Sequence, residues 1–306
     1  MTVREALREG SRLLAAAGSD EATLEAELLL EHALKLDRVH FYQRLAEELT
    51  PQQAEGFRAL LDRRLAHEPT AYILGHREFF GLELEVTPAA IIPRPETEVL
   101  VELVIAFARE RFGEGAFTMA DVGVGSGAIA VAVAHELAQA QVIAIDISPE
   151  ALALAERNAR RHGVAGRIRF AQGDLLEPLR SPSIRSPAGA GLRLRVSGDV
   201  GASRRADVIA ANLPYVRTAD WERLPPEIRE HEPRGGLDGG PDGLRLIERL
   251  LEQAPRHLKP GGALFVEIGD DQGQAAAQLA RRSFPEAHIE VKPDLAGFDR
   301  VLVVRT

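Results

Sequence analysis

The feature that most constrains this fold is a regular alternation of short apolar runs with helical patterns, which begins at Phe117. Runs this short, without polar residues at every second position, are typical of parallel strands covered by helices on both faces. Apolar residues at helical spacing fill the segments between them. The pattern predicts strands at 118–123, 141–147, 167–172, 206–211 and 263–269, with helices at about 127–138, 149–162, 240–257 and 272–283.

The last two predicted strands, 288–293 and 300–305, differ because only a few residues separate them. A parallel connection needs a crossover of about a dozen residues or more, so this pair must be antiparallel. A dinucleotide-binding fold would more often end on another parallel strand. The predicted α/β sheet, seven strands closed by one antiparallel hairpin, is similar to the Rossmann-like domain of class I S-adenosylmethionine-dependent methyltransferases.

The first seventy residues show helical spacing of apolar side chains throughout. Thr50, Pro51 and Gln53 form the signature of a helix start, with an N-cap, a proline in the first turn and a capping-box glutamine. Residues 1–76 carry 9 Lys and Arg against 13 Asp and Glu, a net charge of −4. The segment is therefore predicted to be a small N-terminal helical bundle rather than an RNA-binding arm.

Between the bundle and the sheet, residues 77–86 read as a short hairpin that turns near Gly81. Three prolines make 87–95 a stiff connector, and a helix is predicted from Pro95 to about Arg111. The predicted organisation is a helical domain at 1–76, a β-hairpin linker at 77–95 and an α/β domain at 96–306.

Residues 181–205 interrupt the α/β pattern. They are rich in Ser, Pro, Gly and Ala and contain five arginines against one acid, Asp199. This composition favours a flexible surface insertion. An alternative is that Leu192 to Val196 forms one strand of an exposed hairpin.

Composition excludes several classes of protein. The 306 residues include 37 Lys and Arg against 46 Asp and Glu, a net charge of −9, which argues against a broadly basic nucleic-acid binder. The absence of cysteine excludes disulfides, thiolate metal sites and cysteine nucleophiles, and no metal site is predicted. The longest apolar run, 128–134, is far shorter than the roughly 20 residues that span a bilayer. With no signal-peptide pattern at the N-terminus, we expect a cytoplasmic protein without a membrane partner.

A glycine-rich turn follows the first predicted strand of the sheet. Glycines there let the backbone pass close to a nucleotide-like ligand, and the next helix presents free N–H groups. The motif is compatible with either S-adenosylmethionine or a dinucleotide. Its candidate cofactor-binding residues are Asp121, Gly123, Val124, Gly125, Ser126 and Gly127.

Two acids follow the next two strands. Asp146 stands where a carboxylate usually holds a ribose diol, and Ile147 beside it joins the predicted cofactor site. Asp174, with Leu175, lies where an adenine would be bound. For Asp174, an adenine contact and a plain turn are equally compatible with the sequence.

The tetrapeptide Asn212, Leu213, Pro214 and Tyr215 ends the fourth strand and discriminates between these ligands. Ligands of open α/β sheets bind outside the carboxyl ends of the strands. The Asn212 side-chain oxygen and the Leu213 carbonyl can each accept one N–H of a planar NH₂ group, while Tyr215 covers its π face. These four residues are the candidate catalytic site, and Asn212 also borders the cofactor. Hydride transfer has no use for such an arrangement.

Across nearly its whole length the chain resembles the release factor glutamine methyltransferases. The resemblance is carried by residues 69–75, Phe79 and Gly81, 92–98 (Ile-Pro-Arg-Pro-Glu-Thr-Glu), 121–128, Asp146, 212–215, 231–234 (His-Glu-Pro-Arg) and 239–244 (Gly-Gly-Pro-Asp-Gly-Leu). It implies S-adenosylmethionine as methyl donor and, as protein partners, class I peptide chain release factors. The glutamine of their Gly-Gly-Gln motif would be methylated on the amide nitrogen, and residues 1–76 would recognise the substrate.

One residue departs from that family, which usually reads Asn-Pro-Pro-Tyr where this chain has Leu213. Because the acceptor there is a backbone carbonyl, leucine keeps the hydrogen bond and loses only the fixed φ of proline. Asn-Leu-Pro-Tyr also occurs in ribosomal RNA adenine dimethyltransferases. Arg94 and Glu98 of the 92–98 motif are compatible with a functional role or with a domain-joining ion pair.

Three other functions remain compatible with the sequence. An adenine-N6 methyltransferase acting on RNA or DNA would use the same tetrapeptide, because adenine also offers a planar amine. A catalytically idle binding module would keep the fold without transferring a methyl group. A nicotinamide-dependent oxidoreductase ranks last, because no hydride-transfer site is recognisable. Sequence-specific nucleic-acid binding is not expected.

Overall fold

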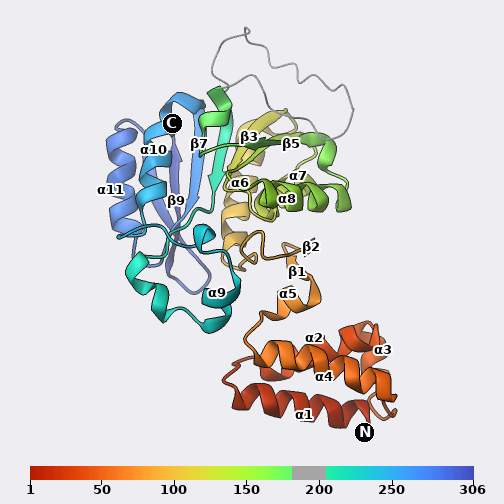
Figure 1. The fold of residues 1–306 in the computed structure, drawn as a ribbon. Coiled ribbons are helices and arrows are strands. Elements are labelled where there is room, and N and C mark those ends of the chain that lie inside the picture. The colour runs from red at the N-terminus through yellow and green to blue at the C-terminus, as the bar shows by residue number, and fades with distance from the viewer. Residues whose placement is uncertain (181–204) are drawn as a thin grey trace. The chain divides into compact units, whose positions relative to one another are not determined.

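The computed structural model describes residues 1–180 and 205–306. The predicted insertion at 181–205, apart from Arg205, and the alternative strand at 192–196 lie outside the described residues. The chain forms two compact units, coloured by residue number in Figure 1. We call residues 1–76 with 224–232 the helical unit, and 77–223 with 233–306 the sheet unit.

The helical unit consists of short helices, most of which pack around one apolar core. Its helices are α1 (Val3–Ala16), α2 (Ala22–Leu34), α3 (Arg38–Gln43), α4 (Pro51–Leu65), α5 (Thr70–Leu74) and α9 (Pro226–His231). Leu14, Leu30 and Phe41 are almost fully buried in that core. The predicted capping box is present, because Gln53 N donates to Thr50 Oγ1 and the Gln53 side chain accepts from Thr50 N.

An ion cluster centred on the buried Arg64 joins three segments of the helical unit. The guanidinium of Arg64 lies 2.8 Å from Glu25 and 2.7 Å from Glu227, oxygen to nitrogen. The Arg64 side chain is only 9% exposed. Residues 224–232 are therefore held to a unit from which they are distant in sequence.

The sheet unit contains the seven-stranded sheet that the sequence predicted. Its order is β5-β4-β3-β6-β7-β9-β8, and β9 alone runs opposite to the other six strands. The predicted fold class, including the antiparallel ending, is confirmed. The strands are β3 (Phe117–Val122), β4 (Ala140–Asp146), β5 (Ile168–Gln172), β6 (Ala206–Ala211), β7 (Leu258–Glu267), β8 (His288–Pro293) and β9 (Asp299–Arg305).

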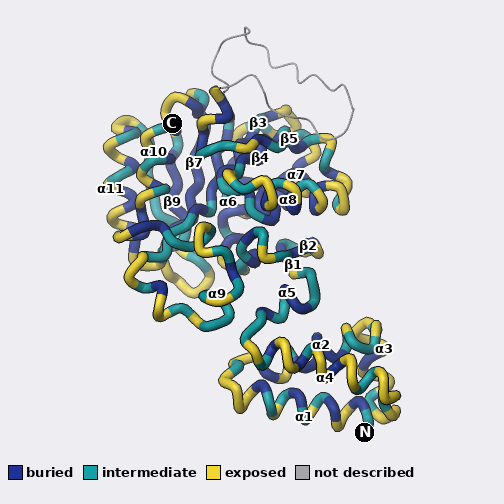
Figure 2. The backbone as a smooth tube through the Cα atoms, in the orientation of Figure 1, coloured by how far each residue is buried: buried dark blue, intermediate teal, exposed yellow. Residues whose placement is uncertain are grey.

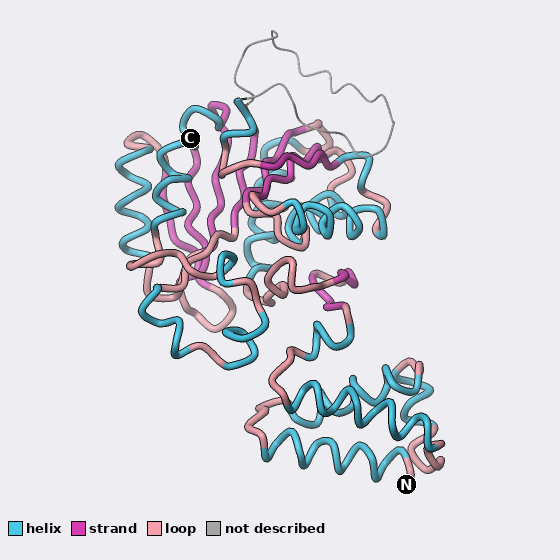
Figure 3. The backbone as a smooth tube through the Cα atoms, in the orientation of Figure 1, coloured by secondary structure: helices cyan, strands magenta, loops and turns pink. Residues whose placement is uncertain are grey.

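Helices cover both faces of this sheet, as Figure 3 shows. They are α6 (Thr97–Phe112), α7 (Ala128–Glu136), α8 (Pro149–Arg161), α10 (Arg245–His257) and α11 (Gly273–Ser283), with 3₁₀ turns η1 (Ala165–Arg167), η2 (Glu177–Arg180), η3 (Thr218–Arg223) and η4 (Arg234–Gly236). Side chains that alternate along the strands pack against α6, α7 and α8 on one face and against α10 and α11 on the other. The inner strands β3, β4, β6, β7 and β9 are mostly buried and dark blue in Figure 2, as coverage on both faces requires, whereas the edge strand β8 has no buried residue.

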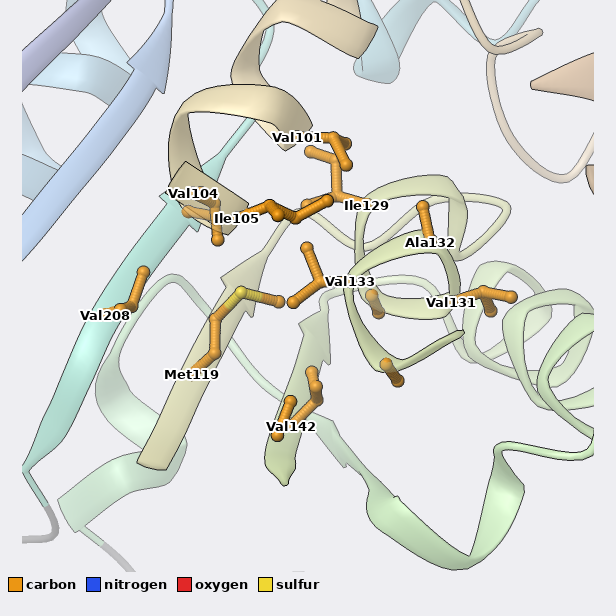
Figure 4. Close-up of a cluster of buried hydrophobic side chains, with 14 of the residues drawn as sticks. Val101, Val104, Ile105, Met119, Ile129, Val131, Ala132, Val133, Val142 and Val208 are labelled. Carbon is orange, nitrogen blue, oxygen red and sulfur yellow. The ribbon is translucent and has the colours of Figure 1, made fainter. Parts of the chain in front are cut away.

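Figure 4 shows the core on the α6–α7 face. Val104 and Ile105 of α6 and Val133 of α7 gather over Met119 of β3. Met119 is completely buried. This packing fixes where β3 ends and α7 begins, which sets the position of the glycine-rich turn between them.

The predicted hairpin forms as β1 (His76–Phe79) and β2 (Leu82–Glu85), turning through Phe80 and Gly81 with both φ angles positive. Phe79 and Leu84 are buried in the core of the sheet unit. Asn158 of α8 ties the hairpin down. It accepts from Glu85 N at 2.7 Å and donates to the carbonyl oxygens of Glu85 at 2.9 Å and Ser126 at 2.8 Å.

One predicted helix begins later than expected. The helix expected from 240 starts at Arg245, because Gly240 and Gly243 adopt positive φ and form a turn in front of it. In the described segments, 1–180 and 205–306, none of the helices combines the length and apolar character that crossing a bilayer requires.

Candidate functional site

A cavity of about 440 Å³ opens at the carboxyl ends of the parallel strands. β3 and β6 are neighbours, but the chain runs from β3 to β4 on one side and reaches β6 on the other. Such a reversal in strand order leaves a crevice where ligands of open α/β sheets bind. Nine predicted site residues line the cavity: Gly123, Gly125, Asp146, Ile147, Asp174, Leu175, Asn212, Leu213 and Pro214.

The glycine-rich turn forms one wall of this cavity. Gly123 N and Val124 N both donate to the Ile145 carbonyl, which ties the turn to the end of β4. Gly123 has φ +77°, and a Cβ there would lie 3.1 Å from Leu213 Cδ2. Only glycine therefore allows the turn after β3 to approach the tetrapeptide after β6 so closely.

Asp146 is fixed by the backbone around it. Its carboxylate accepts from Gly125 N at 3.0 Å and from Ser148 N at 2.9 Å. Burial raises the pKa of Asp146 above its usual value, while the hydrogen bonds from these N–H groups oppose that shift. Ile147, next to it, lines the cavity with its side chain 70% exposed. The Asp146 carboxylate, which can accept hydrogen bonds from hydroxyl groups, thus lies beside the apolar side chain of Ile147.

Asp174 has a partner that the sequence did not suggest. Arg249 of α10 donates to its carboxylate at 2.5 Å, and both residues line the cavity. The pair is partly exposed. Leu175 beside it has φ +50° and is buried.

Four other predicted cofactor residues lie outside the lining. Val124 and Ser126 are buried in the turn, and Gly127 caps α7 with φ +87°. Asp121 is completely buried and accepts from Ala130 N in the first turn of α7 at 2.9 Å. Burial raises the pKa of Asp121 to about 7. These residues therefore hold the conformation of the glycine-rich turn without lining the cavity.

Asn212 and its neighbours form the opposite wall. Asn212 Nδ2 donates to Thr97 Oγ1 at 3.0 Å, at the start of α6. Leu213 is buried against the glycine turn, and Pro214 completes the lining. The cavity therefore brings the predicted cofactor and catalytic residues together.

Tyr215, the last residue of the tetrapeptide, is placed differently. Its ring packs on the core of the α10–α11 face, and its hydroxyl donates to Glu267 Oε1 at 3.1 Å. Burial raises the pKa of Tyr215, and the Glu267 carboxylate adds to that effect. Tyr215 does not line the cavity, so stacking on a substrate stays a prediction.

The Gly-Gly-Pro-Asp-Gly stretch, residues 239–243, packs against the backbone of the tetrapeptide. A Cβ on Gly239 would lie 2.5 Å from the Pro214 carbonyl oxygen, and one on Gly243 would overlap the Tyr215 carbonyl. Gln272, which is buried, donates to that Tyr215 oxygen at 2.9 Å. The spacing of these glycines is thus explained by backbone packed against backbone.

Several lining residues were not predicted. Residues 89–91 of the proline-rich connector, Pro233 and Gly236 border the cavity beside Arg249. The connector and the 231–234 stretch stood out in the sequence, but no local signal indicated contact with a ligand. Glu98, whose role was open, accepts from Phe80 N in the hairpin at 2.9 Å. Among the residues that the structure describes, no cluster of three or more His, Asp and Glu side chains is arranged to hold a metal ion.

Comparison with known proteins adds an independent finding. The profile of the PrmC N-terminal domain matches residues 5–75, and that of a methyltransferase domain matches 114–187. A release factor glutamine methyltransferase from Moorella thermoacetica is 46% identical over 301 residues, covering 98% of this chain and 97% of the relative. One from Geobacter sulfurreducens is 42% identical over 302 residues, covering 98% and 95%.

A solved structure of a release factor-specific protein-(glutamine-N5) methyltransferase from Alicyclobacillus acidocaldarius also aligns. It is 26% identical, and the match covers 72% of this chain and 98% of that chain with a TM-score of 0.40. The two relatives above match over nearly their full lengths, so the similarity includes both the helical unit and the sheet unit.

Proposed function

The chain belongs to the release factor glutamine methyltransferase family, and we propose that it methylates the side-chain amide nitrogen of the glutamine in the Gly-Gly-Gln motif of class I peptide chain release factors. The observation that carries the proposal is the cavity, where the glycine turn and Asp146 face Asn212, Leu213 and Pro214. One wall suits a nucleoside and the other suits a planar amide. The family relationship does not favour the adenine of a nucleic acid as acceptor.

The cavity supports S-adenosylmethionine as the methyl donor. Its volume of about 440 Å³ falls in the range of small-molecule sites, about 300–1,000 Å³. Asp146 would accept from the ribose hydroxyls, and Ile147 would lie against the adenine. Asp174, paired with Arg249, would border the adenine edge. The glycine turn offers backbone in place of side chains, as close approach of a ligand requires.

Methylation would form a bond from the amide nitrogen to the methyl carbon as the carbon–sulfur bond breaks, with the thioether leaving and one N–H proton passing to solvent, so no base is required before attack. Bound S-adenosylmethionine supplies an electrophilic methyl carbon next to a sulfonium. Asn212 Oδ1 and the Leu213 carbonyl would accept the two N–H groups of the glutamine amide and hold its nitrogen in line with that carbon. Such orientation lowers barriers by about 7–11 kcal/mol in favourable intramolecular models. The same two acceptors would stabilise positive charge that develops on the nitrogen.

The helical unit is the proposed recognition element for the release factor. A glutamine inside a folded protein needs contacts beyond a cavity of this size. The sequence of 5–75 matches a domain that accompanies the catalytic domain in this family. Residues 224–232, held by Arg64, would belong to the same recognition element.

The test is direct. The protein is incubated with isotopically labelled S-adenosylmethionine and a purified class I release factor, and the methyl group is located by mass spectrometry. We expect it on the glutamine of the Gly-Gly-Gln motif, and no transfer to a release factor whose motif glutamine is replaced by alanine. Methylation of RNA with no transfer to the release factor would show that the proposed substrate is wrong.

A further inference from the structure

Behind Asn212 lies a short chain of polar side chains in the core of the sheet unit. Asn212 Nδ2 donates to Thr97 Oγ1 at 3.0 Å. The Thr97 hydroxyl is in turn a hydrogen-bond partner of Glu267, whose carboxyl also accepts from Tyr215 at 3.1 Å. Thr97 begins α6 and Glu267 ends β7, so two elements remote in sequence meet behind the tetrapeptide.

The hydrogen-bonded side chains behind Asn212 are buried, and burying the Glu267 carboxyl group lowers the stability of the fold. Thr97 is 4% exposed and Glu267 is completely buried. In the described part of the protein, Glu267 Oε2 has no hydrogen-bond partner. A buried carboxylate with an unsatisfied oxygen lowers stability unless something compensates for its desolvation. Burial accordingly raises the pKa of Glu267, and the hydrogen bonds from Thr97 and Tyr215 oppose that shift.

The direction of the hydrogen bonds matters for Asn212. A threonine hydroxyl has one hydrogen, and a carboxyl oxygen that carries no proton can only accept, as Glu267 Oε1 does from Tyr215. If that hydrogen goes to Glu267, Thr97 Oγ1 is left to accept, and it accepts from Asn212 Nδ2. The reversed amide would bring two acceptor oxygens together. These hydrogen bonds therefore favour the orientation of the Asn212 amide in which Oδ1 is available to bind a ligand in the cavity.

We propose that Thr97 is a positioning residue for methyl transfer, that it fixes the amide of Asn212 with Oδ1 available to the substrate, and that Glu267 fixes the direction of the Thr97 hydroxyl. This inference rests on the proposed function for the role of Asn212. It adds to that function a residue that would touch neither substrate nor cofactor.

Kinetics of the full-length protein provide the first test. Thr97→Val removes the hydroxyl at nearly constant volume and should lower kcat with the release factor by about tenfold to a hundredfold, with the dissociation constant of S-adenosylmethionine changed less than about twofold. Thr97→Ser keeps the hydroxyl and should retain kcat within about threefold. Thr118→Val is the matched control, because Thr118 stands near the opposite end of β3 and should leave kcat unchanged. A Thr97→Val enzyme with normal kcat would overturn the proposal.

A double-mutant cycle separates positioning from general loss of structure. If Thr97 acts through Asn212, the variant with Asn212→Ala and Thr97→Val should be no slower than Asn212→Ala alone. A further loss equal to that of Thr97→Val in the parent would mean that Thr97 acts independently. Glu267→Met removes the acceptor of the Thr97 hydrogen and should also lower kcat. An unchanged kcat in Glu267→Met would refute the part assigned to Glu267.

A readout without substrate keeps this inference distinct from the proposed function. In ¹H–¹⁵N spectra of the free protein, the side-chain NH₂ of Asn212 should exchange more slowly with solvent than in Thr97→Val, and Thr97→Ser should restore the slow exchange. Equal exchange in all three proteins would overturn the positioning role. If the parent enzyme fails to methylate release factors but shows the protected amide, the proposed substrate is wrong and the hydrogen-bonded arrangement stands.

Discussion

The Asp146 carboxylate accepts a hydrogen bond of 3.0 Å from the backbone N of Gly125, so the acid that ends β4 and the glycine turn that follows β3 form one rigid wall. Its other oxygen accepts from Ser148 N at 2.9 Å. Both oxygens are therefore oriented before any ligand arrives. Such preorganisation reduces the ordering that binding requires.

Asp146→Ala should weaken binding of S-adenosylmethionine by about 1–3 kcal/mol, the range for losing a charged hydrogen-bond partner. Isothermal titration calorimetry on the folded variant measures the change. Asp207→Ala is a suitable control, because Asp207 pairs with Lys259 near the start of β6, at the far end of the sheet. Equal affinity of Asp146→Ala and the parent for S-adenosylmethionine would show that Asp146 does not contribute to binding it.

Asn212→Ala should reduce turnover by about a hundredfold or more, as expected when one preorganised transition-state partner is lost. Donor affinity should fall much less, because Asp146 and the glycine turn remain. Asn212→Asp keeps an acceptor but adds a charge near the sulfonium, so we expect tight donor binding with poor turnover. Steady-state kinetics together with calorimetry check both variants. Near-normal methylation by Asn212→Ala would contradict the orientation mechanism.

The buried Asp121 makes stability depend on pH. Burial raises its pKa from 3.8 to about 7, so between these values the folded protein holds a proton that the unfolded chain releases. This contribution to stability is complete below about pH 4 and is lost as the pH rises to about 7. Asp121→Asn cannot titrate at that position. The unfolding free energy of the parent minus that of Asp121→Asn should fall across this range, by at most about 4 kcal/mol.

Urea unfolding of both proteins at several pH values between 4 and 7.5 measures that difference. Titrating groups that do not interact with Asp121 cancel between parent and variant, and Asp146, whose charge raises the pKa of Asp121, is the neighbour whose titration also changes. A difference that does not change with pH would show that Asp121 is ionised in the folded protein at all of these pH values.

Replacing residues 181–205 by a short Gly/Ser linker should preserve methyl transfer to the release factor. The cost of closing a loop changes slowly with its length, so the fold should survive the exchange. Near-ultraviolet circular dichroism and the labelled-donor assay test fold and activity separately. Loss of activity in a folded variant would assign these residues a part in substrate binding.

Deleting residues 1–76 should leave S-adenosylmethionine binding largely intact and abolish methylation of the release factor. The cavity is lined entirely by residues of the sheet unit, which supports the first expectation. Residues 224–232 lose their packing partners in this variant, so its folding must be checked by thermal unfolding. Full-rate methylation by the shortened protein would refute the assignment of recognition to the helical unit.

The sequence predicted the elements whose signals are local. The sheet strands, the antiparallel ending, the Thr50 capping box and the hairpin turn at Gly81 each follow from periodicity or turn chemistry within a few residues. The sequence also predicted that the glycine turn and Asn212 lie close together, because ligand sites form where parallel strands such as β3 and β6 end at the same edge of the sheet.

Contacts between distant segments left no such signal. Arg249 reaches Asp174 from 75 positions away, and Thr97 meets Asn212 across 115. Gln272 holds the Tyr215 carbonyl from a third element. Each lies on an ordinary helix or helix start, and only the packed fold shows which polar partner it meets. The late start of α10 also depends on contacts between distant segments. Gly239 and Gly243, which precede this helix, pack against the backbone of Pro214 and Tyr215.

The hydrogen bonds of Asn158 bear on how this sequence can vary. Its side chain forms these hydrogen bonds with backbone atoms of Glu85 and Ser126. Exchanging the hairpin for that of a relative should therefore preserve these hydrogen bonds with any residue at 85 except proline, which has no N–H to donate. Exchanging α8 for a helix without an amide at 158 should break them. Recombination between relatives should tolerate junctions on either side of the hairpin, provided that the asparagine is inherited.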